Sequence, residues 1–340
     1  MLSRLAAGRR KYGLKKFLVR EANSQINRVL FKSTRQSLVK AFRSLGMEGP
    51  ITVCAHASLS QLGYIEGGAD AVVDALMETV ATDGCLAMPA FSMEGSMKKY
   101  VASGATFDVL KTPSRVGAIP ETFRNRAGVL RSLHPTNSLT AIGKNAERLL
   151  QGHENSLTPY GNETPYGRMV NDENAYILMI NTHVQSLLHH IQERVDFPNL
   201  FLDDMAELAC IDHRGERHMV TTRVMRPKTP YYIAIPGPTR QSAPDWALLH
   251  DYSLIFPAKR DRIVADLGYR FDGYPILHRR REQLIKDGTL RAQRLGKGQI
   301  GLLNVARFVR TIQPELEELI DKYRDYYNTA YIEEQNLRFG

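Results

Sequence analysis

The sequence predicts a globular α/β fold, and three observations support this. Strand-length apolar runs such as residues 51–55 and 176–180 alternate with segments whose apolar side chains recur at helical spacing. The 340 residues are 43% hydrophobic and 24% charged, which is enough apolar material for a sizeable core. No apolar run reaches the length that a transmembrane helix needs.

The first elements form a clear β-α-β unit. A short helix is predicted over residues 34–46, and a buried strand over 51–55 follows it. Gly67-Gly68 then opens a helix, and Asp83-Gly84 turns the chain into a strand over 85–91. Because parallel strands in such units end at the same edge of the sheet, we expect ligands to bind at their carboxyl ends.

The remaining elements are predicted from the same patterns. Helices are expected over 119–125, 144–151 and 186–195, a long polar loop over 153–167, a strand over 176–180, strands within 207–235, and mostly helix over 279–330, interrupted near Gly296, Gly298 and Gly301. No internal repeat is evident in this order. We therefore expect one continuous domain over residues 34–340.

Most of the positive charge lies in an N-terminal extension, residues 1–33. Residues 1–32 carry nine Lys or Arg and one acid, Glu21, so they hold +8 of the net charge of +9. The nearly neutral body argues against nucleic-acid binding. Apolar residues at helical spacing in the extension predict a basic amphipathic helix, which either contacts an anionic membrane or packs on protein. An organellar transit peptide has a similar composition.

The three cysteines, Cys54, Cys85 and Cys210, are far apart and odd in number. This arrangement gives neither a disulfide framework nor a zinc knuckle, and it favours a reducing compartment. We therefore expect a cytoplasmic protein, with the extension able to hold it at the inner face of the membrane. The sequence leaves open whether it is a monomer or a homodimer.

The most informative chemical pattern is His190 followed by Glu193. Residues three apart share a helical face, and a carboxylate beside an imidazole suits the imidazole to removing a proton. In isolation such a pair is commonly a surface or packing pair. His183 and His189 lie nearby, but the spacing and the missing HExxH pattern argue against a metal. No sequence pattern marks a covalent nucleophile.

Two further segments have features of phosphate binding. Gly67-Gly68 precedes a helix, whose exposed N–H groups attract anions, and Thr112-Pro113-Ser114-Arg115 combines hydroxyls with a guanidinium. Each also has a structural interpretation, as a tight turn and as a helix start.

Taken in order, the motifs resemble one family. They are His56-Ala57-Ser58-Leu59-Ser60-Gln61-Leu62-Gly63, Gly67-Gly68-Ala69, Met88-Pro89 with Phe91-Ser92, Thr112-Pro113-Ser114-Arg115 with Gly117, Arg131-Ser132-Leu133-His134-Pro135, Ser138, Gly161 with Thr164-Pro165, and Leu188 to Glu193. This series is similar to the aminoglycoside 3-N-acetyltransferase family. The resemblance runs from about Thr34 to Tyr327 and is densest between residues 51 and 195.

The resemblance implies a three-layer α/β/α fold with a mixed central sheet. It implies acetyl-coenzyme A as donor, with no metal, and a primary amine on an amino sugar or aminocyclitol as acceptor. His190 and Glu193 match the family's catalytic His-x-x-Glu. The residues matching its coenzyme A site are His56, Ala57, Ser58, Leu59, Ser60, Thr112, Ser114 and Arg115, with His134 and Ser138 at the acetyl end.

One stretch departs from the family pattern. Val184 stands where the family usually has Asp, and Leu187 where it usually has Thr. Because an acid in that loop would help to hold a polycationic antibiotic, we expect an acceptor with less positive charge. Glu94, Glu163 and Asp172 are the acids near the motifs. The alternatives are a true aminoglycoside 3-N-acetyltransferase and a non-catalytic descendant used for assembly or membrane tethering.

Overall fold

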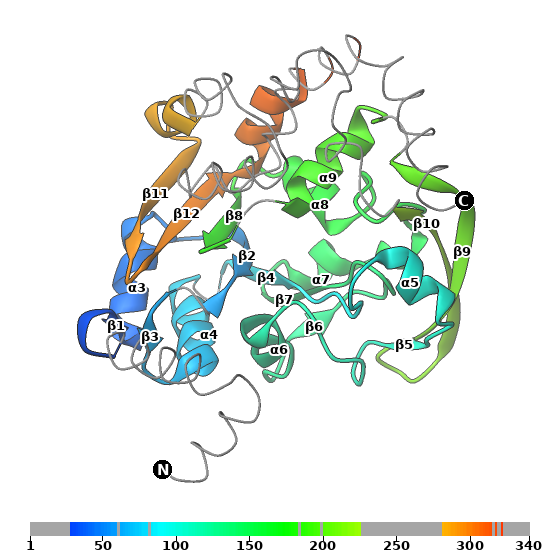
Figure 1. Cartoon of the computed structure of the whole chain (residues 1–340), viewed down its shortest axis with the longest axis horizontal. Helices are drawn as coiled ribbons and strands as arrows, with labels where there is room; N and C mark the ends of the chain where they lie inside the picture. The colour runs from blue at the N-terminus through cyan, green and yellow to red at the C-terminus, as the bar shows by residue number, and fades with distance from the viewer. Residues whose placement is uncertain are drawn as a thin grey trace, which may run out of the picture.

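The computed structural model describes residues 28–59, 62–80, 83–182, 185–197, 200–225 and 281–314, with residues 317 and 321 (Figure 1). Its centre is a seven-stranded sheet in the order β11-β12-β8-β2-β4-β7-β6. The strands are β2 (Thr52–Ala57), β4 (Cys85–Pro89), β6 (Leu130–Arg131), β7 (Leu139–Gly143), β8 (Ala175–Ile180), β11 (Leu290–Leu295) and β12 (Gly298–Asn304). β8, β2 and β4 run parallel and the other neighbours antiparallel. The sheet is therefore mixed.

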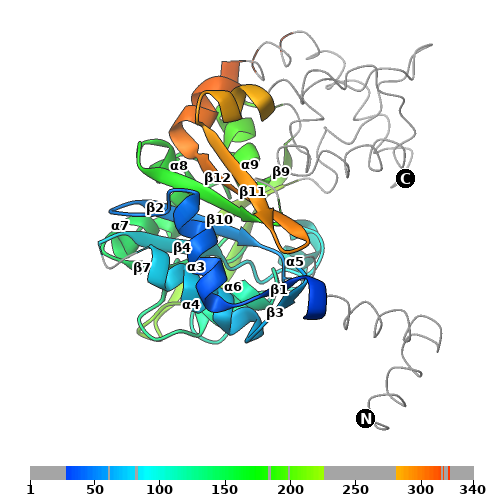
Figure 2. The ribbon, with the colours of Figure 1, turned by 90° about the vertical axis from the view of Figure 1, so that its left-hand side faces the viewer.

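Helices cover both faces of this sheet. Along β2 the side chains of Val53 and Ala55 join one hydrophobic cluster, whereas Cys54 joins the other, as strand periodicity requires. The cluster of Val53 and Ala55 contains residues of α3 (Arg35–Ser44), α4 (Gly68–Thr79) and α6 (Ala118–Arg124). The cluster of Cys54 contains residues of α7 (Ala146–Leu150), α8 (Pro165–Val170), α9 (Gln185–Arg194) and a helix over residues 305–314. Figure 2 shows α3 and α4 lying together. The predicted three-layer α/β/α arrangement is confirmed.

Local sequence explains where the first helix starts. Thr34 precedes α3, its hydroxyl accepts a hydrogen bond from the Ser37 amide at 3.3 Å, and the Ser37 hydroxyl accepts one from the Thr34 amide at 2.8 Å. This capping box satisfies two backbone donors that a helix leaves unpaired. Leu38, Val39 and Phe42 then recur at helical spacing and are buried.

A second sheet lies beside the main one. It has the order β10-β9-β5, with β5 (Phe107–Asp108), β9 (Phe201–Ile211) and β10 (Arg217–Met225). The short helix α5 (Met97–Ala102) packs on it through Met97. The strands expected within 207–235 are confirmed as far as Met225, and the rest of that prediction lies outside the described residues. A short pair, β1 (Lys32–Ser33) and β3 (Tyr64–Ile65), joins the start of the described chain to the body.

Two predictions along the chain were wrong. Residues 290–304 were expected to be mainly helical, but β11 and β12 form an antiparallel hairpin that turns at Gly296, whose φ is 56°. Glycine adopts this conformation without steric cost, and the pairing with β8 outweighs the local helical preference. The segment 153–167 is also not entirely loop, because it contains the 3-10 turn His153–Asn155 and the start of α8, capped by Thr164.

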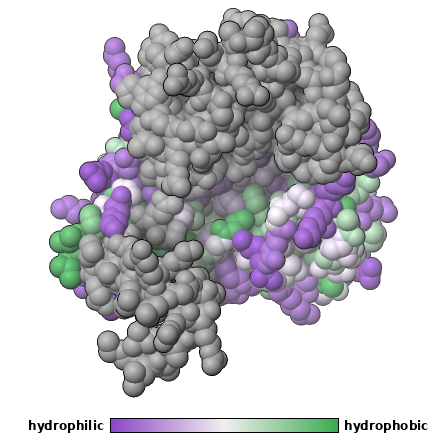
Figure 3. Space-filling model, in the orientation of Figure 1, coloured by the Kyte–Doolittle hydropathy of each residue, from purple (hydrophilic) through white to green (hydrophobic). Residues whose placement is uncertain are grey.

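Of the predicted extension, residues 28–33 are described and the rest lies outside the described residues. Val29 and Leu30 are 79% and 68% exposed there. On the face seen in Figure 3, hydrophilic side chains predominate among the described residues, and hydrophobic ones show near its middle and at its left edge. None of the described helices is long and apolar enough to span a membrane.

Candidate active site

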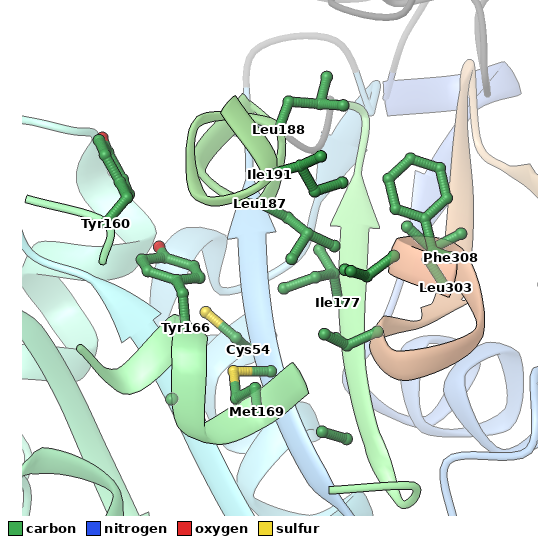
Figure 4. Close-up of a cluster of buried hydrophobic side chains, with 14 of the residues drawn as sticks. Cys54, Tyr160, Tyr166, Met169, Ile177, Leu187, Leu188, Ile191, Leu303 and Phe308 are labelled. Carbon is green, nitrogen blue, oxygen red and sulfur yellow. The ribbon is translucent and has the colours of Figure 1, made fainter. Parts of the chain in front are cut away.

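Helix α9 carries the predicted catalytic pair. It follows β8, and Leu187 and Ile191 extend from it toward Ile177 on that strand (Figure 4). These two residues are four apart, so they share one face of the helix and anchor it to the sheet. His190 and Glu193 lie on another face, where their polar atoms meet the backbone of Tyr160.

His190 is fully buried, and its tautomer follows from its hydrogen bond. Nδ1 faces the Tyr160 carbonyl, which can only accept, so Nδ1 carries the proton. Nε2 is buried and has no hydrogen-bond partner among the described residues. Burial, with a smaller contribution from the Arg194 charge, lowers the pKa of His190 to about 4 despite this hydrogen bond. The imidazole is therefore neutral at pH 7 and has its lone pair on Nε2.

Glu193 binds the backbone of the same residue, Tyr160, through its amide rather than its carbonyl. Its Oε1 accepts a hydrogen bond from the Tyr160 amide at 2.9 Å. Burial raises the pKa of Glu193 to about 7, against the opposing effects of the Thr158 side chain and the Tyr160 amide. The spacing predicted that Glu193 would contact His190 and raise its basicity. The hydrogen bonds instead run through Tyr160, and burial makes His190 less basic.

The loop around Tyr160 was the main part of the site that the sequence reasoning missed. Gly161 belonged to the resemblance, and the structure gives its reason. A Cβ atom at Gly161 would stand 2.3 Å from Thr158 Oγ1 and 3.2 Å from Glu193 Oε2. A larger residue at this position would crowd both the Thr158 hydroxyl and the carboxylate. Nothing in the local sequence pairs Tyr160 with residues thirty or more positions later.

The first segment predicted to bind the acetyl donor, coenzyme A, lies at the carboxyl end of β2. His56 and Ala57 are the last residues of that strand, and the Ser58 amide donates to the Ile180 carbonyl at 2.9 Å. Leu59 follows directly, and Ser60 lies outside the described residues. This segment and the carboxyl end of β8, the strand that precedes α9, are therefore adjacent at one edge of the sheet.

The second segment predicted to bind coenzyme A is held by two charged side chains, the partly exposed Glu121 and the buried Arg131. The Ser114 amide donates to Glu121 Oε2 at 2.7 Å, and the Thr112 carbonyl accepts from Arg131. Arg115 remains half-exposed and pairs with Glu94 at 3.1 Å. Thr112, Ser114 and Arg115 thus lie beside the end of β4, since the Arg115 amide also donates to the Phe91 carbonyl at 2.7 Å.

Arg131 was not predicted as a functional residue, although it belongs to a quoted motif. Its guanidinium is buried, donates to the Ala90 carbonyl and to the hydroxyls of Ser92 (2.9 Å) and Ser138 (3.1 Å), and lies 4.7 Å from the Phe107 ring centroid. Burial lowers the pKa of Arg131 to about 10, so it stays charged at neutral pH. Arg131 joins the segments after β4 and β5 to the start of β7.

His134 and Ser138 are fully buried rather than open to solvent. His134 accepts from the Asn137 amide at 3.2 Å and stacks on His153, with 4.5 Å between ring centroids. Burial lowers the pKa of His134 to about 3 and that of His153 well below its ordinary value. Both rings are therefore neutral, and the structure gives them packing and hydrogen-bonding roles.

The sequence argues against a metal at His183, His189 and His190, and the described residues do not include all three of them. His183 lies outside the described residues, and His189 hydrogen-bonds Gln192 at 2.8 Å. A different group, Asp212, Glu216 and His218, gathers at the β9–β10 turn. Asp212 already accepts from two amides of that turn, so this group has a structural explanation.

Known proteins share sequence similarity with much of this chain. Residues 54–242 match the family model described as aminoglycoside 3-N-acetyltransferase. The chain belongs to this family. The acetyltransferase-like protein YokD, encoded by the SPbeta prophage of Bacillus subtilis (strain 168), is 30% identical over 188 residues, which cover 50% of this chain and 68% of that one. Aminoglycoside N(3)-acetyltransferase VIII of Streptomyces fradiae is 30% identical over 48% of this chain and 62% of its own length.

Solved structures share the fold of this family member. The complex titled AAC-IIIb binary with CoASH has a TM-score of 0.59 at 20% identity, covering 84% of this chain and 97% of that one. AAC-VIa bound to sisomicin has a TM-score of 0.60 at 22% identity, covering 84% and 98%. The aminoglycoside 3-N-acetyltransferases are acyltransferases, so the chain belongs to an enzyme family.

Proposed function

We propose that the protein transfers the acetyl group of acetyl-coenzyme A directly to a primary amine of an amino sugar or aminocyclitol-like acceptor. The observation that carries this proposal is the state of His190. Its Nδ1 proton is fixed by the Tyr160 carbonyl, which leaves a buried Nε2 lone pair as a general base. Membership of the acetyltransferase family supports the reaction class.

Direct transfer in a ternary complex needs only this base and a positioned thioester. The amine nitrogen attacks the carbonyl carbon, the C–N bond forms, and the C–S bond breaks with its electron pair leaving on sulfur. Nε2 takes the proton that the amine loses, and the departing thiolate takes one up. Glu193 acts indirectly, because it holds the amide of Tyr160, the residue whose carbonyl orients the imidazole.

For the donor we propose the edge formed by the ends of β2 and β4. The residues are His56, Ala57, Ser58, Leu59 and Ser60 on one side and Thr112, Ser114 and Arg115 on the other, with His134 and Ser138 behind the acetyl end. The half-exposed Arg115 suits an anionic group of coenzyme A. The coenzyme A named in the AAC-IIIb title supports this donor.

For the acceptor we propose a molecule with little positive charge. Leu187, where the family usually has Thr, is fully buried in the core, so it offers no polar group to a ligand. Asp172 accepts from Thr52 at the amino end of β2, away from the proposed edge. The charge of Glu94 is balanced by Arg115. Arg194, in contrast, is close enough to His190 to lower its pKa.

The first experiment is calorimetric titration with acetyl-coenzyme A, followed by thiol-release assays on amino sugars and on sisomicin. Binding together with turnover of the amino sugars supports the proposal. Faster turnover of sisomicin favours a true aminoglycoside acetyltransferase, which the names of the relatives support. Absence of acetyl-coenzyme A binding would indicate a non-catalytic descendant.

We propose further that the extension contacts an anionic membrane from the cytoplasmic side. Its charge and the exposed Val29 and Leu30 support this, and the buried free cysteines suit a reducing compartment. Because Lys32 and Ser33 form β1, the test deletes residues 1–27 only. Vesicles of anionic lipid should bind the full chain and not the truncated one, and equal binding would refute the idea. Light scattering distinguishes a monomer from a homodimer.

A further inference from the structure

Asn181 has an unusual backbone conformation at a central position. It directly follows β8 and has a φ of 54°, in the left-handed region. Among the described residues other than glycine, only Asp196 shares a positive φ. Glycine would adopt this conformation without steric cost, so the asparagine side chain is present although the backbone disfavours it.

The side chain of Asn181 is buried and incompletely paired. The residue is 3% exposed, and Oδ1 stands 2.7 Å from the position that a Cβ at Gly298 would take. Its backbone amide donates to the Gln299 carbonyl at 2.9 Å. Nδ2 has no hydrogen-bond partner among the described residues. Because an unpaired buried donor is costly, its N–H groups are suited to a ligand.

The position of Asn181 places its unpaired N–H groups near the residues of the proposed reaction. Ile180, its neighbour on β8, accepts the Ser58 amide at 2.9 Å, so Asn181 lies beside the donor segment that follows β2. The chain then enters α9, which carries His190. Asn181 thus follows a strand end that contacts the proposed thioester segment and, in the sequence, precedes the helix of the base. Backbone strain of this kind clusters at active sites.

We propose that Asn181 is a catalytic residue whose Nδ2–H donates a hydrogen bond to the acetyl carbonyl oxygen of the donor. This inference rests on the proposed function. Negative charge develops on that oxygen as the amine attacks, and the bond from Nδ2 strengthens at that moment. No covalent bond to Asn181 forms or breaks. The side chain supplies a preorganised donor and returns unchanged.

Two variants separate this role from a structural one. Asn181→Gly removes the donor but relieves the left-handed strain, so the variant should melt no lower than wild type. Asn181→Asp keeps the shape and replaces the donor with an acceptor. Asp196→Gly is the matched control, because it relieves the same strain outside the site.

The decisive measurement does not depend on the acceptor. Infrared difference spectra of bound acetyl-coenzyme A labelled with ¹³C at the carbonyl report its hydrogen bonding directly. The carbonyl stretch should lie at lower frequency in wild type and Asp196→Gly than in Asn181→Gly, at an unchanged Kd. With an acceptor found, kcat should fall by about 10²- to 10³-fold in both Asn181 variants.

The outcomes distinguish this inference from the proposed function. If acetyl-coenzyme A binds wild type and Asn181→Gly with the same carbonyl frequency, the Asn181 assignment is wrong and the acetyltransferase proposal stands. A wild-type kcat in a folded Asn181→Gly protein would also show that the Asn181 assignment is wrong. If acetyl-coenzyme A does not bind at all, both proposals fail.

Discussion

Replacing Glu193 with glutamine should stabilise the protein at alkaline pH while slowing the reaction. Burial raises the pKa of Glu193 from 4.5 to about 7. Between these values the folded protein keeps a proton that the unfolded chain releases, so stability falls as pH rises across this window. Below pH 4.5 Glu193 is protonated in both the folded and the unfolded state, so its burial does not reduce stability through ionisation. Above pH 7 it is ionised in both states, and the folded state is destabilised by the full free energy of ionising a buried carboxylate, roughly 3 kcal/mol.

The measurement is urea denaturation of wild type and Glu193→Gln at pH 5 and pH 8. The glutamine keeps an oxygen acceptor for the Tyr160 amide but cannot ionise. The stability of the variant relative to wild type should therefore increase by about 2–3 kcal/mol between the two pH values. Glu207→Gln, at an exposed position on β9, is the control and should show no such change. A difference between Glu193→Gln and wild type that does not vary with pH would refute the reasoning.

Three further predictions follow from the other buried groups. His190→Ala should slow acetyl transfer by about 10²- to 10⁴-fold in single-turnover assays, and wild-type turnover would rule it out as the base. Arg131→Lys, with fewer donors for the carbonyl and hydroxyl groups it joins, should lose about 2–4 kcal/mol in urea denaturation and raise the Kd for coenzyme A. His134 and His153 are neutral when folded, so stability should fall by several kcal/mol as pH drops from about 6.5 towards 3. Replacing either histidine with glutamine should make stability fall less steeply over this pH range. An unchanged pH dependence would contradict the conclusion that these histidines are neutral in the folded protein.

Local sequence was sufficient to predict the parallel core of the fold. Apolar runs at 51–55 and 176–180 coincide with β2 and β8, because strands buried on both faces need continuous hydrophobic residues. The hairpin of β11 and β12 was missed because its stability comes from pairing with β8, more than a hundred residues earlier. A pattern of local periodicity contains no information about such a partner.

The same distinction applies to the site. His190 and Glu193 could be selected from the sequence because a three-residue spacing places them on one helical face. Tyr160, which joins them, could not, because it acts through its backbone and any residue type except proline supplies the same amide and carbonyl. Arg131 shows another limit. Its side chain connects the ends of several strands, and only the folded chain brings those acceptors together.

The low basicity of His190 restricts which amines can react. An alkylammonium group has a pKa near 10, so transferring its proton to an imidazole whose pKa is about 4 costs roughly 8 kcal/mol. Neighbouring C–O bonds withdraw electrons from the amine of a sugar and make it less basic than an alkylamine, which reduces this cost. Ionisation of Glu193 near pH 7 places a negative charge one helical turn away and reduces it further. The buried base and the core position of Leu187 therefore both support the acceptor proposed above, a weakly basic amino sugar that carries few other charges.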